Sequence, residues 1–499
     1  MLLTSLIVLP NEADGISWEE QSSHVISGSE GIASTPLIVA DRQMNVHVAW
    51  SEGQDDIMFR SMIQGEWGEI EKVSESSTVG SIDPSMTIDG DGNVHIAWVE
   101  WSFAQGTREI VQRSLVDGEW GPITIISQDK NDFSGLPSIA AGDDGRIHIV
   151  WADGYNPNTK ILYRSSTGGS FGPIEEVRPD GGGHPSWPIV AAGPGGDAHV
   201  VWYDTMDFPG AEEGTSDIFH RSKSGGAWGN TELVSAGSDK YSMTGDIGVD
   251  SDGIVHVTWI DDTDFPGSEI GSDIYHRIKD GSVWQDMELV SAGSVNMSDN
   301  PSLAITPEGD AHIVWRESYG EGFSDIMHSY LSAGVWSDYT TVSTDKDMSA
   351  APSLVSDGLV YIHVVWIDYG EHPELGGGSF AYHKQLWVSD KALVQGVIVD
   401  EDGAPIPGVE IWVSNPGLAA VTDEQGRYAF AIESGDYVIE AIKDGVTIQT
   451  MSISASGGES LVVGHSTTEP DESVSHMIYI IAGGLGLVAI IFLLVRLRS

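Results

Sequence analysis

The segment Asn45-Val-His-Val-Ala-Trp50 constrains the fold of this chain most, because its His-x-x-Trp core occurs six more times. In six of the seven copies a proline lies eleven residues before the histidine, and Gly245 replaces it in the fifth. Consecutive histidines are 48 to 57 residues apart. A repeat at this period indicates the architecture before any local pattern does. The seven histidines are His47, His95, His148, His199, His256, His312 and His363.

One period, residues 84–127, reads as four strands. Pro84 opens the first strand, where its missing N–H does least harm. Val94–Trp98 is a β-branched and aromatic run, which is typical of a buried strand. A third strand is expected at Glu109–Ser114 and a fourth at Trp120–Ser127. Four strands in about fifty residues is the content of one propeller blade, so the sequence predicts an all-β fold.

The seventh copy ends near Lys384 with no recognisable fourth strand after it. The missing pattern stands at the other end of the chain, where Trp18–Ser27 resembles Trp67–Ser74. We therefore predict a seven-bladed β-propeller over residues 16–388, closed by its N-terminal strand. Such closure removes the unpaired strand edge that an open ring would expose.

The residues before the propeller, 1–15, begin with a short apolar run that is typical of a signal peptide, although it lacks the usual positive start. An ordinary hydrophobic N-terminus is the alternative interpretation.

Residues 389–464 alternate short strands with glycine turns. They resemble the carboxypeptidase regulatory-like domain, a small transthyretin-like β-sandwich. That resemblance implies a spacer or adhesive unit that brings no catalytic residues. The matching motifs are Asp402-Gly403, Pro407-Gly408-Val409, Thr422-Asp423, Gly426, Tyr428 and Gly435-Asp436-Tyr437.

The C-terminal residues predict a membrane anchor. Residues 465–476 form an acidic linker, and the nineteen residues 477–495 carry no charge. At ~1.5 Å per residue a helix of this length crosses a bilayer core. Arg496 and Arg498 follow at once, and positive charge beside a span indicates the cytoplasmic side. We expect a single transmembrane helix at 477–495, a cytoplasmic tail at 496–499 and the bulk of the chain outside the cell.

The charge of the chain excludes some partners. With 23 basic and 75 acidic residues the formal net charge is −52. Nucleic acid and anionic membrane surfaces would be repelled, so we expect neither as a partner.

The repeated histidines and arginines are interpreted as structural. Both faces of a blade are covered by its neighbours, so His and Trp three positions apart are both expected to be buried. Seven equivalent histidines around a ring cannot meet at one metal, and we expect each to bond to backbone. A repeated arginine in the third strand is expected to bind a carboxylate or a carbonyl group. The arginines are Arg60, Arg113, Arg164, Arg221 and Arg277.

The long loops after the second strands are the candidate ligand site. The motif Asp-Phe-Pro-Gly-Ala/Ser-Glu occurs at Asp207 and again at Asp264, one blade later. Oxygen clusters of this kind suit calcium, so these two aspartates are also the candidate metal ligands, against the alternative of a solvated acidic loop. The candidate ligand-binding residues are Asp204, Asp207, Glu212, Asp261, Asp264, Glu269, Arg316, Asp368 and Glu371.

The propeller is similar to the sialidase-like, BNR-repeat superfamily. The matching pattern is Pro-Ser-Ile/Leu-Ala, a glycine turn, His-Val/Ile-x-Trp, Ile-Tyr/Phe-x-Arg-Ser and a Trp-led fourth strand. The resemblance implies an arginine cluster on the ring face, and Arg108, Arg178 and Arg316 are the arginines placed for it. No Tyr–Glu nucleophile pairs with them, so sialidase activity is not expected.

Two functions follow from this organisation. The first is a cell-surface, membrane-anchored protein for binding or adhesion, whose ligand is a glycan or a protein. The alternative is an extracellular glycan-active hydrolase or lyase that uses loop carboxylates such as Asp207, Asp264 and Glu371. Because a fold implies no chemistry by itself, the first interpretation is the main one, and catalysis is not expected.

Overall fold

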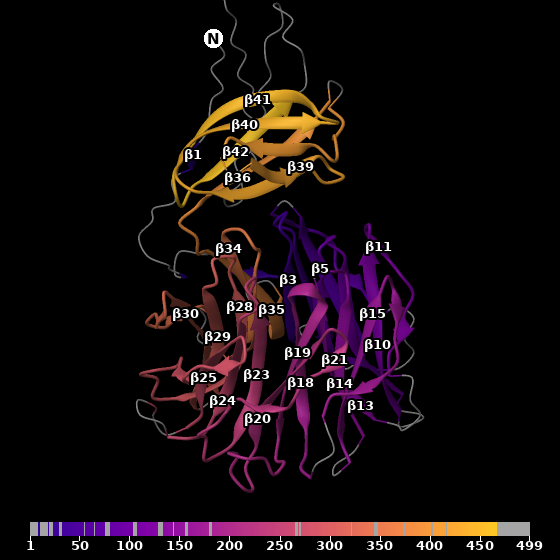
Figure 1. Ribbon diagram of the computed structural model, residues 1–499, viewed down its shortest axis with the longest axis vertical. Coiled ribbons are helices and arrows are strands. Elements are labelled where there is room, and N and C mark those ends of the chain that lie inside the picture. The colour runs from indigo at the N-terminus through magenta and orange to yellow at the C-terminus, as the bar shows by residue number, and fades with distance from the viewer. Residues whose placement is uncertain are drawn as a thin grey trace, which may run out of the picture.

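The computed structural model shows a propeller of β-sheets with a smaller β-sandwich beside it (Figure 1). Among the described residues the one helical element is the 3-10 turn η1 (Pro194–Gly196). The all-β prediction is therefore confirmed. The described residues are 8–9, 18, 23–28, 32–53, 55–63, 65–74, 80–102, 107–127, 133–142, 144–154, 158–178, 182–264, 268, 271–320, 322–343, 348–372, 375–400, 403–415 and 417–466.

Each blade starts with an inner strand that carries the repeated proline, or Gly245 in the fifth blade. Every inner strand contacts the inner strand of the next blade, and the last of them contacts the first. The inner strands are β3 (Ala33–Ala40), β8 (Gly80–Ile88), β13 (Ser134–Ala141), β18 (Ser186–Gly193), β23 (Ser242–Val249), β28 (Met297–Ile305) and β33 (Met348–Ser356).

The second strand of each blade carries the His-x-x-Trp segment and pairs antiparallel with the inner strand. It is buried on both faces because adjacent blades cover it, which is why its sequence is a continuous apolar run. The second strands are β4 (Val46–Glu52), β9 (Val94–Ser102), β14 (Ile147–Asp153), β19 (Asp197–Asp204), β24 (Val255–Asp261), β29 (Ala311–Gly320) and β34 (Tyr361–His372).

The third strand pairs antiparallel with the second and carries the repeated arginine. The sixth and seventh blades share one sheet through a single parallel pair between their strands, Ser324 and Met348. The third strands are β5 (Asp56–Ile63), β10 (Thr107–Val116), β15 (Lys160–Thr167), β20 (Asp217–Ser224), β25 (Asp273–Asp280), β30 (Phe323–Ser332) and β35 (Gly376–Trp387).

In the first six blades the fourth strand consists of two short pieces. Its first piece holds the aromatic residue, and the second pairs further along the third strand. The pieces are β6 (Glu66–Trp67), β7 (Glu71–Lys72), β11 (Glu119–Trp120), β12 (Thr124–Ile125), β16 (Ser170–Phe171), β17 (Glu175–Glu176), β21 (Ala227–Trp228), β22 (Glu232–Leu233), β26 (Val283–Trp284), β27 (Glu288–Leu289), β31 (Val335–Trp336) and β32 (Thr340–Thr341).

The N-terminal strand β2 (His24–Val25) pairs antiparallel with β35, in the position of the fourth strand of the seventh blade. Trp18, which precedes it, is fully buried, and its indole N–H donates to Nδ1 of His328 in the sixth blade at 3.1 Å. Arg60 of the first blade donates to the carbonyl of Ile26. This segment therefore contacts both the sixth and the first blade, as the resemblance of Trp18–Ser27 to a fourth strand predicts.

The fourth-strand tryptophan joins adjacent blades by packing edge-on against a third-strand ring of the preceding blade. Trp120 meets Phe59 with a centroid separation of 5.1 Å, and Trp284 meets His220 at 5.4 Å. The remaining pairs are Trp228 with Tyr163, Trp336 with His276, Trp18 with His328 and Trp67 with His383.

The repeated histidines are buried, as predicted, but their partners are side chains on the third strand and not backbone groups. We expected backbone partners because that is the commonest way to satisfy a buried polar group. The third strand instead places a polar side chain opposite each histidine ring. In the fourth to seventh blades this partner is a second histidine, at 3.0–3.2 Å. The partners are Ser61, Ser114, Tyr163, His220, His276, His328 and His383.

The repeated arginines bind carbonyl groups, one of the two kinds of partner predicted for them. Nε of Arg113 donates to the carbonyl of Gly121 in its own blade, and Nη1 donates to Val73 in the blade before. Its guanidinium also lies over the Trp120 ring at 5.5 Å. Arg60, Arg164, Arg221 and Arg277 make the same contacts.

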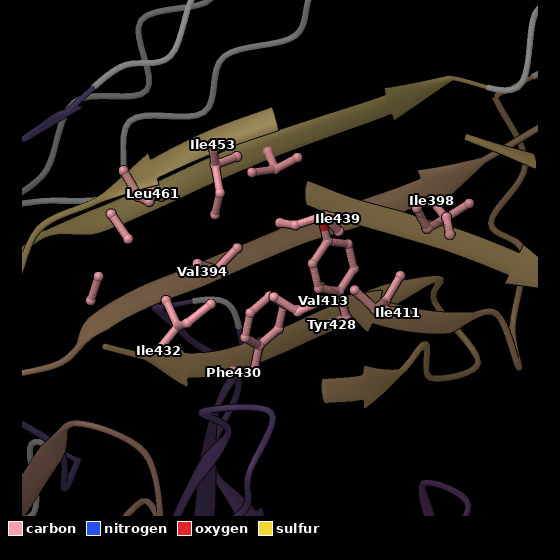
Figure 2. Packing of buried hydrophobic residues seen from close by; sticks show 14 of the residues in the cluster. Val394, Ile398, Ile411, Val413, Tyr428, Phe430, Ile432, Ile439, Ile453 and Leu461 are labelled. Atoms are coloured by element: carbon pink, nitrogen blue, oxygen red, sulfur yellow. The ribbon is translucent and has the colours of Figure 1, made fainter. Parts of the chain in front are cut away.

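The C-terminal sandwich consists of two four-stranded sheets, with the strand orders β1-β42-β36-β39 and β38-β37-β40-β41. Their facing side chains, among them Val394, Ile411, Tyr428 and Ile439, interdigitate to form a separate apolar core (Figure 2). The strands are β1 (Val8–Leu9), β36 (Ala392–Val399), β37 (Glu410–Val413), β38 (Gly417–Val421), β39 (Arg427–Ile432), β40 (Gly435–Lys443), β41 (Val446–Ala455) and β42 (Ser460–Ser466).

The blades have two different ends. We call the end where the inner strands begin and the second strands finish the loop face, and the opposite end, with short turns after the inner strands, the turn face. The sandwich lies at the turn face (Figure 1). Lys391, which precedes β36, binds Glu308 in a turn of the sixth blade at 2.6 Å. The loop face is thus the end of the propeller away from the sandwich.

No helix within the described part of the chain has the length and apolar character to cross a membrane. The predicted span 477–495 and the tail 496–499 lie outside the described residues, as do 1–7 and 10–15 of the predicted signal peptide. Of the predicted linker 465–476, residues 465–466 belong to β42, and 467–476 lie outside the described residues. These assignments stay predictions.

We predict that Trp18→Ala destabilises the propeller strongly. Replacing a fully buried tryptophan by alanine costs ~3–5 kcal/mol through lost burial and the cavity left behind. Chemical denaturation followed by tryptophan fluorescence measures the change. Trp412→Ala, at a part-exposed position of the sandwich, is the matched control and should leave the propeller transition where it is. Equal stability of the Trp18→Ala and wild-type propellers would contradict the prediction.

We also predict that the propeller loses stability as the pH falls below 6.5. Burial lowers the pKa of the repeated histidines from 6.5, to about 3 for His199, His256 and His363 and to about 4 for His47, His148 and His312. Between those values the unfolded chain binds more protons than the folded one. The buried histidines therefore contribute their whole stabilisation above pH 6.5. The free energy of unfolding decreases as the pH falls from there toward 4.

Melting temperatures measured from pH 7.5 to 4.5 at constant ionic strength test this expectation. One pKa unit corresponds to ~1.4 kcal/mol, and several histidines act together, so the fall should be steep. Acidification also reduces the charge of −52 and with it the self-repulsion of the chain, which by itself would stabilise the fold. A melting temperature that rises on acidification would show that the histidines do not dominate.

Candidate functional site

The loop face is shaped by a β-bulge that recurs at the start of every inner strand. The pairing of the inner and second strands shifts there, for example between Ser34 and Leu37 in the first blade. In six blades the residue before the proline has a φ of 45–53°, in the left-handed region. A bulge of this kind redirects a side chain out of the ladder. The residues so placed are Thr35, Asp83, Leu136, Trp187, Asn300 and Ala351.

Large apolar side chains are exposed on the loop face. Trp187, at the bulge of the fourth blade, is 53% exposed, and Tyr241, just before β23, is 54% exposed. Tyr369, near the end of β34, and the hairpin residues Tyr319 and Phe323 of the sixth blade are exposed as well. These side chains come from the fourth to the seventh blades and lie at the same end of the propeller, which makes this end the candidate binding surface.

An ion pair lies beside one of these rings. Arg316, at the end of the second strand in the sixth blade, donates from Nε and Nη2 to the two oxygens of Asp299. These hydrogen bonds raise the pKa of the guanidinium, and Tyr369 is close enough to contribute. The carboxylate therefore holds Arg316 in place as one half of an ion pair on the loop face.

A second arginine, Arg178, has a structural role. Its Nε donates to Asp204, and its Nη2 donates to the carbonyl of Gly182. Burial raises the pKa of Asp204, while the Arg178 charge opposes that shift. Because both side chains are buried, this pair ties the connection between the third and fourth blades to the end of β19.

Three of the nine predicted ligand-binding residues are buried inside the blades. Asp204, Asp261 and Asp368 stand two positions after the repeated tryptophan, where every blade has Asp or Glu. Asp261 accepts from the Trp259 indole at 3.1 Å and from the Ser242 hydroxyl at 2.8 Å. The acidic residue therefore fastens the second strand to the inner strand. Burial and internal partners argue against ligand binding by these three carboxylates.

The exposed acidic loops are placed differently. Asp207 and Glu212 are exposed, and Asp264 forms an exposed ion pair with Lys240 at 2.7 Å. Glu269 and the side chain of Glu371 lie outside the described residues. The structure thus leaves the ligand-binding prediction untested for these residues, and it shows that Arg316, also predicted, is paired with Asp299.

The calcium prediction for Asp207 and Asp264 gains no support from the structure. No group of three or more His, Cys, Asp or Glu side chains suited to a metal ion is found among the described residues. Asp264 is occupied by the Lys240 ammonium group. A calcium ion needs six to eight oxygen ligands, which two separate aspartates do not supply.

The structure adds functional candidates that the sequence interpretation missed. The aromatic residues Trp187, Tyr241 and Tyr369 break the repeat at positions that vary from blade to blade, so periodicity alone did not select them. For Trp187 the signal was an aromatic residue at a position where the other blades have Thr, Asp, Leu, Asn or Ala. A search for departures from the repeat would have found Trp187.

A hollow of about 280 Å³ opens on the loop face between the first and second blades. Its lining comes from the ends of β3, β4, β8 and β9 and includes Asp83 and Trp101. Burial raises the pKa of Asp83, and the Arg108 charge opposes this shift. Arg108 itself lies between two rings, 4.2 Å from the centroid of Trp101 and 4.1 Å from that of Phe133.

Residues 394–466 match the model of the carboxypeptidase regulatory-like domain, which agrees with the predicted sandwich. No curated protein matches the chain in sequence.

Among solved structures, a polysaccharide lyase, an ulvan lyase bound to -[GlcA(1-4)Rha3S]-, is similar with a TM-score of 0.50 and 14% identity, over 70% of this chain and 93% of that chain. An α-L-arabinanase of Penicillium chrysogenum complexed with arabinobiose has a TM-score of 0.41 and 12% identity, over 73% of this chain and 97% of that chain. A Hadza microbial sialidase has a TM-score of 0.39 and 10% identity, over 69% of this chain and 74% of that chain. At such identities the likeness concerns the fold alone.

Proposed function

We propose that the loop face of the propeller binds a polysaccharide and that the protein is glycan-active, as a hydrolase or a lyase. The exposed aromatic side chains Trp187, Tyr241 and Tyr369 carry this proposal. A sugar ring presents C–H groups on its faces and hydroxyl groups at its edge, so it covers an aromatic ring without losing its hydrogen bonds to water. Binding clefts combine such apolar walls with a few polar groups.

The structural neighbours support a glycan over a protein ligand. The proteins named by those structures act on ulvan, arabinan and sialosides, although the likeness is one of fold. For this chain the role of glycan-active protein is therefore an inference from the loop face, with the neighbours as an analogy. Pure binding or adhesion is the rival function.

We assign the catalytic roles to Tyr369 and Arg316. A phenol can give or accept a proton, and it stands here beside a fixed cation on an open surface. A cation held in this way can stabilise negative charge that develops on a bound sugar. Retaining and inverting hydrolases instead need two carboxyl groups ~5–9.5 Å apart. A tyrosine near an arginine fits a lyase, and it fits equally a hydrolase that uses a tyrosine nucleophile.

We predict that Trp187→Ala and Tyr241→Ala weaken polysaccharide binding. Each lost aromatic contact is worth ~0.5–1.5 kcal/mol, which is roughly a two- to tenfold loss of affinity. Titration calorimetry of the full chain in detergent with ulvan and with linear arabinan measures the effect. Trp412→Ala, which removes a part-exposed tryptophan from the sandwich, is the control and should bind as the wild type does. Unchanged affinity in both loop-face variants would refute the binding surface.

We further predict that Tyr369→Phe abolishes shortening of the polysaccharide while leaving its affinity within about twofold, because the ring stays and only the hydroxyl group is lost. Size-exclusion chromatography of the polysaccharide after incubation measures chain length. Wild-type protein that binds the polysaccharide without shortening it would leave adhesion as the function.

The proposal includes a location. We propose that the chain is anchored through residues 477–495 with its bulk outside the cell. The sandwich at the turn face then stands between the anchor and the propeller, and the loop face points away from the membrane. Protease added to intact cells is expected to release a fragment containing the propeller. Complete protection of the chain would contradict this orientation.

A further inference from the structure

The hollow between the first two blades has the composition of a sugar-binding subsite. It is lined by Ser34, Thr35, Ser51, Ile82, Asp83 and Trp101. Its volume of about 280 Å³ is slightly below that of pockets for drug-sized ligands, which begin at roughly 300 Å³. A space of this size suits one sugar residue and not a larger group.

The polar lining is fixed in place by the backbone. Thr35 and Asp83 both occupy the bulge position of their blades, with φ values of 45° and 53°. The Thr35 hydroxyl donates to the Ser51 hydroxyl at 3.2 Å. Neighbouring hydroxyl groups and a carboxylate on rigid strands offer acceptors and donors at fixed positions, which is what an array of sugar hydroxyls requires.

The apolar lining is held equally firmly. Trp101 lies at the end of β9, and the guanidinium of Arg108 lies over its ring. The same guanidinium lies over Phe133 of the third blade. These two cation–π contacts favour the observed position of the Trp101 ring.

The charge of the hollow selects against acidic sugars. Asp83 is the one ionisable group among its lining residues, and its negative charge would repel a uronate or a sulfate group. Arg108 lies near Asp83 and offsets part of this charge without lining the hollow. The remaining field comes from a chain with a net charge of −52. An uncharged sugar is not repelled by these negative charges.

We propose that this hollow binds one uncharged sugar residue of the glycan, with Asp83 accepting hydrogen bonds from its hydroxyl groups and Trp101 covering its apolar face. The inference rests on the proposed function, since the rest of the glycan continues over the loop face. It adds the class of sugar at one subsite and the residues that choose it.

The experiment compares an uncharged probe, linear arabinan, with an acidic one, ulvan, by titration calorimetry on the full chain in detergent. Asp83→Asn keeps the shape of the side chain, and asparagine tolerates the left-handed backbone at this position. A lost hydrogen bond to a charged group corresponds to roughly a tenfold to hundredfold loss of affinity for arabinan. Affinity for ulvan should rise in the same variant, because the repulsion is removed.

Two further variants complete the design. Asp91→Asn changes an exposed carboxylate of the same blade at the turn face, and it should change neither affinity. Trp101→Ala should weaken arabinan binding, and a melting curve shows whether the propeller remains folded. Wild-type binding of arabinan that persists unchanged in Asp83→Asn would overturn the subsite alone. Failure of the wild type to bind either polysaccharide would overturn the proposed function as well.

Discussion

Adjacent blades hold together through one repeated contact, the packing of a fourth-strand tryptophan on a third-strand ring of the preceding blade. In four of these contacts the indole also donates to a glutamate of the preceding blade, as from Trp284 to Glu232 at 2.9 Å. That glutamate also binds His220, which binds His199 in turn. One tryptophan therefore orders polar groups on three strands of its neighbour. Buried polar networks are stable only when every member has a partner, so this arrangement explains why the repeat tolerates so little change.

The same contact explains the place of the N-terminal segment. Trp18 packs on His328 as the other tryptophans pack on their rings, and Trp67 of the first blade packs on His383 of the seventh. Without Trp18 the His312–His328 pair would lose its cover and a hydrogen-bond donor. Trp18 thus makes for the seventh blade the contact that Trp67, Trp120, Trp228, Trp284 and Trp336 make for five of the others.

The sequence predicted the repeating part of the fold and much less of the site. Period, strand order and the carbonyl-binding arginines all follow from residues that recur, because a recurring residue must meet the same surroundings in every blade. The acid after each tryptophan also recurs, but in the fourth and fifth blades it was interpreted as part of a loop. Asp204 and Asp261 consequently stood among the ligand candidates, although each is held inside its blade. The roles of non-recurring residues such as Trp187 and Arg108 could be assigned only from the structure. The sequence does not show which residues of different blades lie close together.

The two ends of the propeller differ in structure: one contacts the sandwich, and the other presents side chains that vary between blades. At the turn face short hairpins leave little to vary, and the ion pair of Lys391 with Glu308 connects this end to the sandwich. At the loop face each bulge releases one side chain from the ladder, and a substitution there alters the surface without disturbing the inter-blade contacts. A rigid ring with variable residues at one end is an arrangement in which binding specificity can change while stability stays the same. Asp83 and Trp187 occupy equivalent bulges and yet present a carboxylate and an indole, so the loop face differs from blade to blade on a scaffold that does not.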